Sequence, residues 1–211
     1  MKARIAGIER ITREVNIRGS LNLDGTGRAS VSTGIGFLDH MLELFAKHGL
    51  FDLRLKARGD LHVDLHHTNE DLGLALGEAF RQALGGKKGI HRMGSAFVPM
   101  DESLARVRAI VDVSGRPYFR WGWKTGRSSD SFRRAKNIRS ARLNYDLDDA
   151  RHFLESFVTK GELTVHVDVL KAGEDIHHVL EAVFKAMGRA LRQAVSIDPR
   201  VKGVPSTKGK L

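Results

Sequence analysis

The chain has 211 residues, no cysteine and a formal charge of +10 at pH 7. This length suits one large domain or two small ones with a full hydrophobic core, and the absence of cysteine excludes disulfides, cysteine-rich zinc sites and thiol nucleophiles. Because the N-terminal residues contain no apolar signal core and no run reaches the length of a membrane span, we expect a soluble protein of the cytoplasm.

The positive charge is concentrated in one segment, 116–142. It contains nine lysines and arginines and one acid, Asp130, so that nine minus one gives +8 of the total +10. Its aromatic residues lack the regular spacing of a base-stacking platform. We therefore interpret 121–142 as a surface loop and expect no nucleic-acid partner. The alternative, a nucleic-acid-binding protein that uses this segment, predicts binding that weakens steeply with salt.

The first part of the chain is expected to form strands around one helix. The helix is predicted where apolar residues recur at helical spacing from Leu38 to Phe45, with His40 beside the apolar stripe and Gly49 as the stop signal. Alternating residues and turn signals predict strands on both sides of this helix. The predicted strands cover residues 4–12, 15–23, 28–32, 51–57 and 61–65.

A pair of histidines follows the last of these strands. Thr68 stands three residues before Asp71 at the head of an apolar stripe, which predicts a capping box and the start of a helix. Glu70 lies four residues after His66 and three after His67, so the three side chains are neighbours if the helical turn includes the histidines. Imidazole and carboxylate groups are ligands for manganese, iron and zinc. Adjacent histidines point in different directions, so the pair could serve two different metals.

The histidine pattern returns 111 residues later in the chain. Residues that correspond at this offset are His66 and His177, His67 and His178, Glu70 and Glu181, Gly77 and Gly188, and Arg81-Gln82-Ala83 and Arg192-Gln193-Ala194. With an offset of 112, His40 corresponds to His152. One copy is equally compatible with surface histidines beside acids that favour a helix N-terminus. Two copies in register favour a metal site.

The second half repeats the predicted order of elements. Strands are expected within 97–113, broken around Pro99–Glu102, and over 163–170. Helices are expected over 148–158 and from the second histidine pair to about residue 195.

This order predicts an internally duplicated α+β fold. Each half is expected to contain a roughly four-stranded sheet and two helices, and the helices of both halves are expected to share one core. The half-repeats span 1–95 and 96–211 and together form one domain. Two copies indicate an internal duplication and not a solenoid.

Seven stretches carry a family resemblance, in order and over nearly the whole chain. They are TGIGFLDHML (33–42), HHTNED (66–71), VPMDE (98–102), SGRPY (114–118), HFLESF (152–157), HHVLEAVFKA (177–186) and PSTKG (205–209). The chain resembles the imidazoleglycerol-phosphate dehydratase family. The resemblance implies a ribosomal protein S5 domain 2-like fold, whose two halves form one catalytic domain. It also implies a carbon–oxygen lyase (a hydro-lyase) of histidine biosynthesis. This lyase would convert D-erythro-imidazole-glycerol phosphate to imidazole-acetol phosphate in a cytoplasmic homo-oligomer of 24 subunits, with active sites between subunits.

The resemblance also implies two Mn(II) ions in each active site, each bound by three histidines and one glutamate. Carried over to this chain, the ligands are His40, His66, His67, Glu70, His152, His177, His178 and Glu181. The duplication divides this set into three histidines and one glutamate in each half. The remaining His48, His62, His91 and His166 are expected to be ordinary surface or strand residues.

The phosphate and the proton transfers require further residues. The positions that match the family's phosphate-binding side chains are Arg92, Arg116, Ser206 and Lys208. Arginine suits multidentate phosphate recognition, and lysine adds a point charge. Taken alone, Arg116 is more simply a turn residue and Lys208 a tail residue. A general acid and a base are needed for dehydration. The candidates are Glu14, and Glu70 or Glu181 where metal does not fully engage them, and of these we favour Glu181.

The chain departs from the family at three places. Gly36 stands where the family usually has proline, and Asp175 stands where an asparagine usually precedes the second histidine pair, which bears on hydrogen bonding around the ligands. The segment 121–142 is longer and more basic than the family's connection. A dinuclear metal hydrolase would use the same ligands, but it leaves the SGRPY and STKG stretches unexplained.

Overall fold

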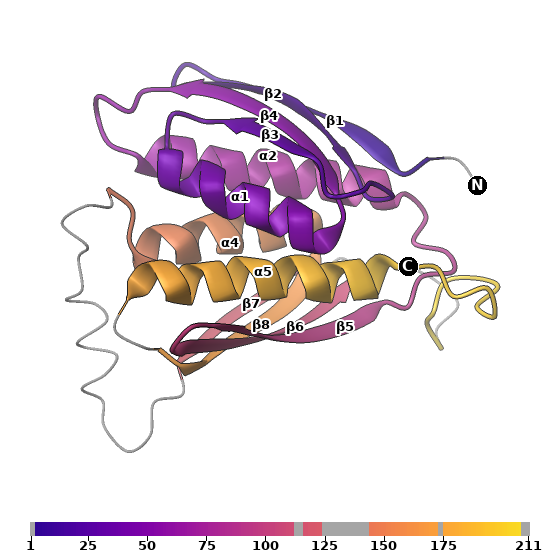
Figure 1. The fold of residues 1–211 in the computed structure, drawn as a ribbon. Coiled ribbons are helices and arrows are strands. Elements are labelled where there is room, and N and C mark those ends of the chain that lie inside the picture. Colours follow the sequence, from indigo (N-terminus) through magenta and orange to yellow (C-terminus); the bar gives the residue numbers. More distant parts are fainter. Residues whose placement is uncertain (1–2, 112–115, 124–143, 173–174, 208–211) are drawn as a thin grey trace.

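The structure, a computed structural model, describes residues 3–111, 116–123, 144–172 and 175–207. The described residues form two four-stranded sheets and four helices (Figure 1). The first sheet contains β1 (Ile5–Ile11), β2 (Val15–Asn22), β3 (Ala29–Ser32) and β4 (Asp52–Gly59), and the second contains β5 (Met93–Met100), β6 (Ser103–Val111), β7 (Tyr118–Trp123) and β8 (Leu163–Lys171). The helices are α1 (Gly36–Gly49), α2 (His66–Leu84), α4 (Leu147–Gly161) and α5 (Ile176–Val195).

Both halves have the same topology. The strand orders are β1-β2-β4-β3 and β5-β6-β8-β7. In each sheet three neighbouring strands are antiparallel, and the last one, β3 or β7, pairs in parallel with its neighbour. This confirms the predicted α+β fold with an internal duplication. β5 begins at Met93, and the division of the chain at residues 95 and 96 stays a prediction.

The two sheets lie outside and the helices lie between them (Figure 1). Helix α1 packs against α5, and α2 packs against α4, so each helix pair joins the two halves. The apolar faces of all four helices and the inner faces of both sheets form one continuous core. Its largest fully buried side chains include Phe51, Phe80, Phe153, Phe157 and Phe184.

Two glycines let the paired helices approach closely. A Cβ atom on Gly77 of α2 would lie 2.4 Å from the carbonyl oxygen of Phe157 of α4. A Cβ atom on Gly188 of α5 would lie 2.4 Å from the carbonyl oxygen of Phe45 of α1. The correspondence of these glycines in the sequence therefore reflects equivalent helix contacts, and within each pair the helices run parallel.

Residues 61–65 form a turn, which corrects the strand expected there. The backbone N–H of Val63 donates to the carbonyl of Asp60 at 2.8 Å, and the side chains of Leu61 and Val63 are exposed. The alternation of apolar residues was a misleading signal, because no strand in the described part of the chain pairs with this segment.

The capping box expected at Thr68 is also absent. Helix α2 begins at His66, so Thr68 lies inside the first turn, and its buried hydroxyl has no hydrogen-bond partner among the described residues. The carboxylate of Asp64 instead accepts a hydrogen bond from the backbone N–H of His66 at 2.7 Å. The histidines therefore belong to the helix, as their spacing from Glu70 required.

Strand β7 was not predicted, because its residues were assigned to the basic segment. Its place beside β8 matches that of β3 beside β4. The rest of the basic segment, 124–143, lies outside the described residues, and so do Ser114, Gly115 and Lys208.

Candidate active site

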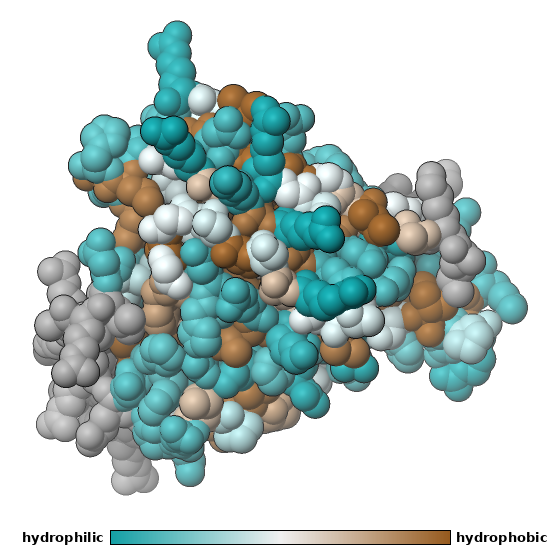
Figure 2. Space-filling model, turned by 45° about the horizontal axis from the view of Figure 1, so that its top comes forward, coloured by the Kyte–Doolittle hydropathy of each residue, from teal (hydrophilic) through white to brown (hydrophobic). Residues whose placement is uncertain are grey.

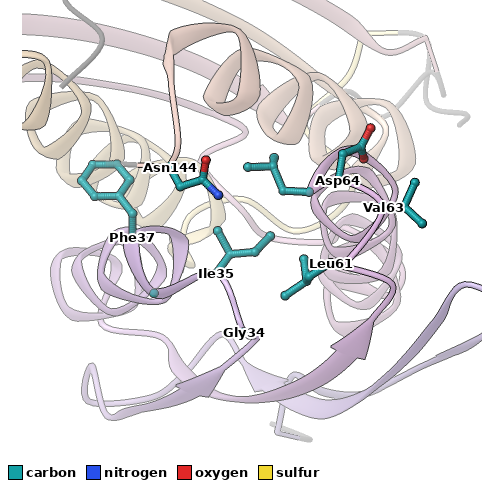
Figure 3. Close-up of a pocket in the computed structure, with 9 residues that line it drawn as sticks. Gly34, Ile35, Phe37, Leu61, Val63, Asp64 and Asn144 are labelled. Atoms are coloured by element: carbon teal, nitrogen blue, oxygen red, sulfur yellow. The ribbon is translucent and has the colours of Figure 1, made fainter. Parts of the chain in front are cut away.

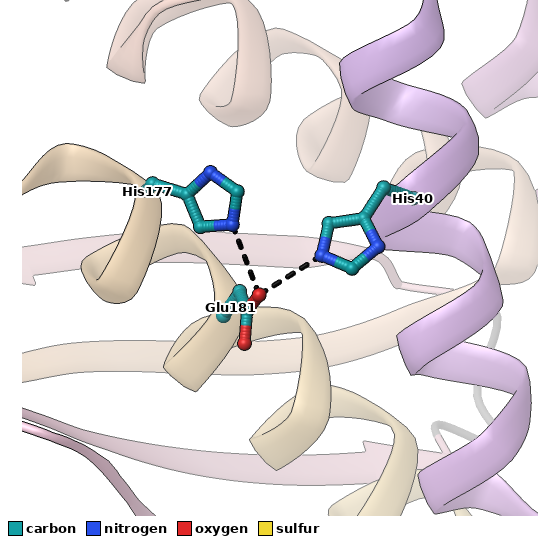
Figure 4. Close-up of side chains that lie close together, drawn as sticks. All are labelled: His40, His177 and Glu181. Atoms are coloured by element: carbon teal, nitrogen blue, oxygen red, sulfur yellow. Dashed lines mark hydrogen bonds and ion pairs between the residues drawn. The ribbon is translucent and has the colours of Figure 1, made fainter.

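Two histidines and a glutamate meet where α1 packs against α5 (Figure 4). Nε2 of His40 lies 2.9 Å from Oε1 of Glu181, and Nε2 of His177 lies 3.0 Å from the same oxygen. All three potential ligand atoms lie within 4.8 Å of one another. We call this group the α1–α5 triad, and it has the donor atoms and the convergence of a metal site.

Glu181 is held by a third partner, Lys185, one turn further along α5. The ammonium group of Lys185 forms an ion pair with Oε2 of Glu181, whose side chain is only 10% exposed. Burial alone would raise the pKa of Glu181, but hydrogen bonds from Lys185 and both histidines outweigh it and lower the pKa to about 2. Sequence reasoning missed Lys185, although its position four residues after Glu181 placed both on one helix face.

A second group of the same kind occupies the equivalent place between α2 and α4. Nε2 of His66 lies 3.7 Å from Oε2 of Glu70, and the ring centroids of His66 and His152 are 5.4 Å apart. These three side chains line a hollow together with Leu74 and Glu155. This α2–α4 triad is more open, because the Glu70 side chain is 49% exposed and Leu74 stands where Lys185 stands in the other half.

Each triad combines residues of both halves. His40 of the first half joins His177 and Glu181 of the second, and His152 of the second half joins the first half's pair. The predicted division of the ligands into three histidines and one glutamate per half holds along the sequence but not in space. The reason is the helix packing, which places α1 on α5 and α2 on α4.

The second histidine of each pair points away from its triad. Nδ1 of His67 lies 3.0 Å from Asp60 and 4.0 Å from Glu14. Nδ1 of His178 lies 3.0 Å from Glu102. The hydrogen bonds to Asp60 and to Glu102 raise the pKa of His67 and His178 respectively. The expectation that adjacent histidines point in different directions is confirmed for both pairs.

The residues expected to bind phosphate lie at the other end of the molecule. Nη1 of Arg92 donates to the carbonyl of Pro205 at 2.8 Å, and the Arg92 backbone N–H donates to the carbonyl of Ala194 near the end of α5. Ser206 follows Pro205, and Arg116 precedes β7 at the same end. Because α5 has 20 residues, about 1.5 Å of rise per residue separates its two ends by roughly 30 Å.

A hollow lies beside the triads, between the starts of α1 and α2 (Figure 3). Its walls include the turn corrected above, at Leu61 and Val63, and the entry to α1 at Ile35 and Phe37. The ring of Phe37 lies 5.2 Å from that of His177, so the hollow borders the α1–α5 triad. Sequence reasoning did not predict this hollow, because residues 61–65 were expected to form a strand.

Comparison of the chain with known proteins identifies its family. A family profile described as imidazoleglycerol-phosphate dehydratase matches residues 33–191. The chain belongs to the imidazoleglycerol-phosphate dehydratase family. Proteins of that name from Methylorubrum extorquens and Thermobifida fusca are 50% and 51% identical over 99% of this chain and 100% of their own length.

Solved structures of the imidazoleglycerol-phosphate dehydratase family agree with the fold. The enzyme from Staphylococcus aureus superposes with a TM-score of 0.73 at 31% identity, covering 92% of this chain and 99% of that one. The Pyrococcus furiosus protein, solved in complex with (S)-C348, gives 0.74 at 32% identity, covering 97% and 100%. The chain is therefore an enzyme of histidine biosynthesis, a hydro-lyase acting on a small molecule. Among the described helices, none is both long and apolar enough to cross a membrane.

The two point departures from the imidazoleglycerol-phosphate dehydratase pattern are local. Gly36 is the first residue of α1, and a Cβ atom there would meet nothing within 4 Å. The carboxylate of Asp175 caps α5 by accepting a hydrogen bond from the His177 backbone N–H at 2.8 Å. Asp64 does the same for His66 in the first half, so an aspartate at this position matches its own internal repeat.

Proposed function

We propose that this chain dehydrates D-erythro-imidazole-glycerol phosphate to imidazole-acetol phosphate with two Mn(II) ions in each active site. The observation that carries the proposal is the α1–α5 triad, whose ligand atoms converge, together with the recurrence of the same residue types at the equivalent place between α2 and α4. The matches to imidazoleglycerol-phosphate dehydratases support the substrate class.

The residues fit a divalent cation of this kind. Imidazole nitrogens bind transition metals, and carboxylate oxygens suit manganese in particular. In the α1–α5 triad, Lys185 occupies Oε2 of Glu181 and leaves Oε1 facing the two histidines. His40, His177 and Glu181 would hold one ion, and His66, His152 and Glu70 the other. When bound, such ions would polarise the substrate's imidazole ring and stabilise negative charge on it.

The acid–base roles follow from the surroundings of each carboxylate. With a pKa of about 2, Glu181 is ionised near neutral pH and is a weak base, which suits a metal ligand better than the acid–base role favoured from the sequence. Glu14 lies outside both triads, half exposed and 4.0 Å from Nδ1 of His67. We therefore assign Glu14 as a group that exchanges protons with the substrate, and Glu70 and Glu181 chiefly as ligands.

The separation of the groups favours active sites shared between copies of the chain. The triads lie at the start of α5, and Arg92 and Ser206 lie near its end, roughly 30 Å away along a helix that rises about 1.5 Å per residue. One small substrate cannot span that distance. Each triad also lacks a third histidine, while His67 and His178 of the same chain point elsewhere. A second copy would supply the missing groups, in keeping with the proposed homo-oligomer of 24 subunits.

A cytoplasmic setting is part of this proposal. It is supported by the absence of cysteine from a chain of this size, which suits a reducing compartment.

The test is a measurement of metal content and turnover on the purified protein, with and without added Mn(II). We expect about two Mn(II) ions per site and turnover of imidazole glycerol phosphate that requires them. His177→Ala and His66→Ala should each lower the metal content and abolish turnover, because each removes a ligand from one triad. The matched control is His166→Ala, which removes a histidine on β8 outside both triads. Full metal content and turnover in His177→Ala would refute the assignment.

A further inference from the structure

A groove outside the active site lies between the edge strand β5 and helix α5. It is lined by Ser95–Phe97 of β5 and by Arg189, Arg192, Gln193 and Ser196. The side chain of Phe97 is 59% exposed. Oε1 of Gln193 accepts a hydrogen bond from the Ser95 backbone N–H at 2.8 Å, so the amide N–H groups of Gln193 are what it can offer to a ligand. We call this the β5–α5 groove.

The first half of the molecule serves as an internal reference for this groove. At the offset of 111 residues, Arg192 and Gln193 correspond to Arg81 and Gln82, and Arg189 corresponds to a glutamate, Glu78. In the first half, Oε1 of that glutamate accepts hydrogen bonds from Arg81 at 2.6 Å and from Gln82 at 2.9 Å. The second half has replaced the acid at the centre of this network by a second arginine.

Among the residues that the structure describes, this replacement leaves two guanidinium groups without an ion-pair partner. Across the described parts of the chain, no carboxylate forms an ion pair with Arg189 or Arg192. Arg192 lies in the last turn of α5, where a cation is favoured by the helix dipole, as Arg81 is in α2. Arg189 lies before that turn and stands one helical turn from a like charge, which weakens a helix. Helix stability therefore accounts for Arg192 but not for Arg189.

The positive charges on this side of α5 affect the pKa of a neighbouring histidine. Burial, followed by the charges of Lys185 and Arg189, lowers the pKa of His48 on α1. The side chain that faces the groove from β5, Phe97, carries no charge, and its ring lies 5.7 Å from the guanidinium carbon of Arg106. The groove and its surroundings are therefore cationic.

We propose that the β5–α5 groove binds a phosphate group, either free or as a phosphomonoester, between Arg189 and Arg192. Guanidinium groups are the side chains best suited to bind a phosphate through several hydrogen bonds at once. The amide N–H groups of Gln193 and the hydroxyl of Ser95 border the same groove and complete the set of donors. This site is separate from the residues expected to hold the substrate's phosphate, namely Arg92, Arg116, Ser206 and Lys208.

The test of this phosphate site copies into α5 the glutamate that α2 has at the equivalent position. Arg189→Glu rebuilds in α5 the glutamate–arginine pair that α2 already contains, so it should fold and neutralise Arg192. Isothermal titration calorimetry of the intact protein with inorganic phosphate should show a binding site in the wild type that weakens at least tenfold in Arg189→Glu. Lys56→Glu, the same charge change on the exposed face of β4, is the matched control and should retain this site.

Three further measurements separate this groove from the proposed substrate site, identify the source of the phosphate and guard against misfolding. Arg92→Ala should leave the groove's phosphate binding intact, because that residue belongs to the proposed substrate site, so failure of the proposed function would not affect this measurement. Titration with glycerol 3-phosphate distinguishes the source of the phosphate: tighter binding than inorganic phosphate indicates an ester that also contacts Phe97. Arg189→Gln tests the site if the glutamate variant does not fold. Equal phosphate binding by wild type and both Arg189 variants, or equal loss in Lys56→Glu, would overturn the proposal.

Discussion

At the scale of single residues, the structure predicts that replacing the glycine at the start of α1 with proline stabilises the folded protein. Gly36 is the first helical residue and has free space for a side chain, and Ile35 before it, with φ of −105° and ψ of 84°, lies outside the α region that a following proline disfavours. Proline at this position lacks only an N–H that has no partner within the helix. Gly36→Pro should raise the free energy of unfolding by about 0.4–1 kcal/mol by restricting the unfolded chain, measured by urea denaturation.

The control for this prediction is Gly36→Ala, which removes the glycine without fixing φ and should have a smaller effect. A lower unfolding free energy in the proline variant would mean that the N–H of Gly36 has a structural role.

An acid–base pair near the N-terminus predicts a pH effect. A hydrogen bond from Arg4 lowers the pKa of Asp24, while Arg4 also donates to the carbonyl of Val195 at the end of α5. An acid with a lowered pKa in the folded state stabilises the protein above its ordinary pKa, and this contribution is lost as the pH falls through the lowered value. Because Asp24 is about half exposed, Asp24→Asn should cost less than about 1 kcal/mol at pH 7.

The same variant should lose less stability than the wild type when the pH is lowered from about 4 to 2, since it no longer has this carboxylate to protonate. Parallel curves of unfolding free energy against pH would show that the pair does not contribute to folding.

Residue types were predictable from the sequence, but their partners were not. The duplication identified His66, His177 and their glutamates as one recurring unit, and both units form triads in the structure. Which histidine of each pair faces the triad depends on where the neighbouring helix lies. Lys185 is a different case, because its ion pair with Glu181 joins residues four positions apart on one helix and was therefore within reach of sequence reasoning.

At the scale of helices and strands, the close contact between paired helices predicts that two glycines are essential. A methyl group on Gly77 or Gly188 would lie 2.4 Å from a backbone oxygen of the facing helix, so the helices would have to separate. Gly77→Ala and Gly188→Ala should each lower the free energy of unfolding by about 1–3 kcal/mol, the usual cost of overpacking a core. Thermal unfolding monitored by circular dichroism would measure this loss.

Gly7→Ala is the reference substitution, because a Cβ atom on this strand glycine meets nothing within 4 Å. Equal stability of the Gly188 and Gly7 variants would show that α1 and α5 adjust without cost.

The elements that were predicted wrongly or missed depend on contacts with distant parts of the chain, which their local sequence does not show. Residues 61–65 alternate like a strand but pair with no strand that the structure describes, and Asp64 is the acceptor at the start of α2. Thr68 has the spacing of a capping residue, yet the helix begins two residues earlier. β7 is rich in aromatic and basic residues, and only its pairing with β8 makes it a strand.

At the scale of the whole molecule, the duplicated α+β architecture was predictable, and the exchange between the halves was not. A repeat in the sequence fixes which elements each half contains. It does not say whether α1 packs on the second helix of its own half or on α5 of the other. Because the four helices lie parallel in two cross-half pairs, neither half contains a complete triad, and the two halves depend on each other for the site.

The assembly of several copies can be tested by mixing inactive variants. If active sites form between copies, a chain with a broken triad and a chain with a broken outer histidine should complement each other. His177→Ala and His67→Ala should each be inactive alone. When both are produced in one cell and co-assemble, at most roughly a quarter of the activity should return, because a two-copy site draws each part from an intact chain half the time.

The control pairs His177→Ala with Glu181→Ala. Both substitutions break the same triad, so no copy can supply an intact one, and the mixture should stay inactive whatever the assembly. If each site were built from one chain, the first mixture would be equally inactive, since every chain in it carries a lesion. Size measurements on each mixture must show that the copies have assembled. A co-assembled but inactive mixture of His177→Ala with His67→Ala would place each site within a single chain.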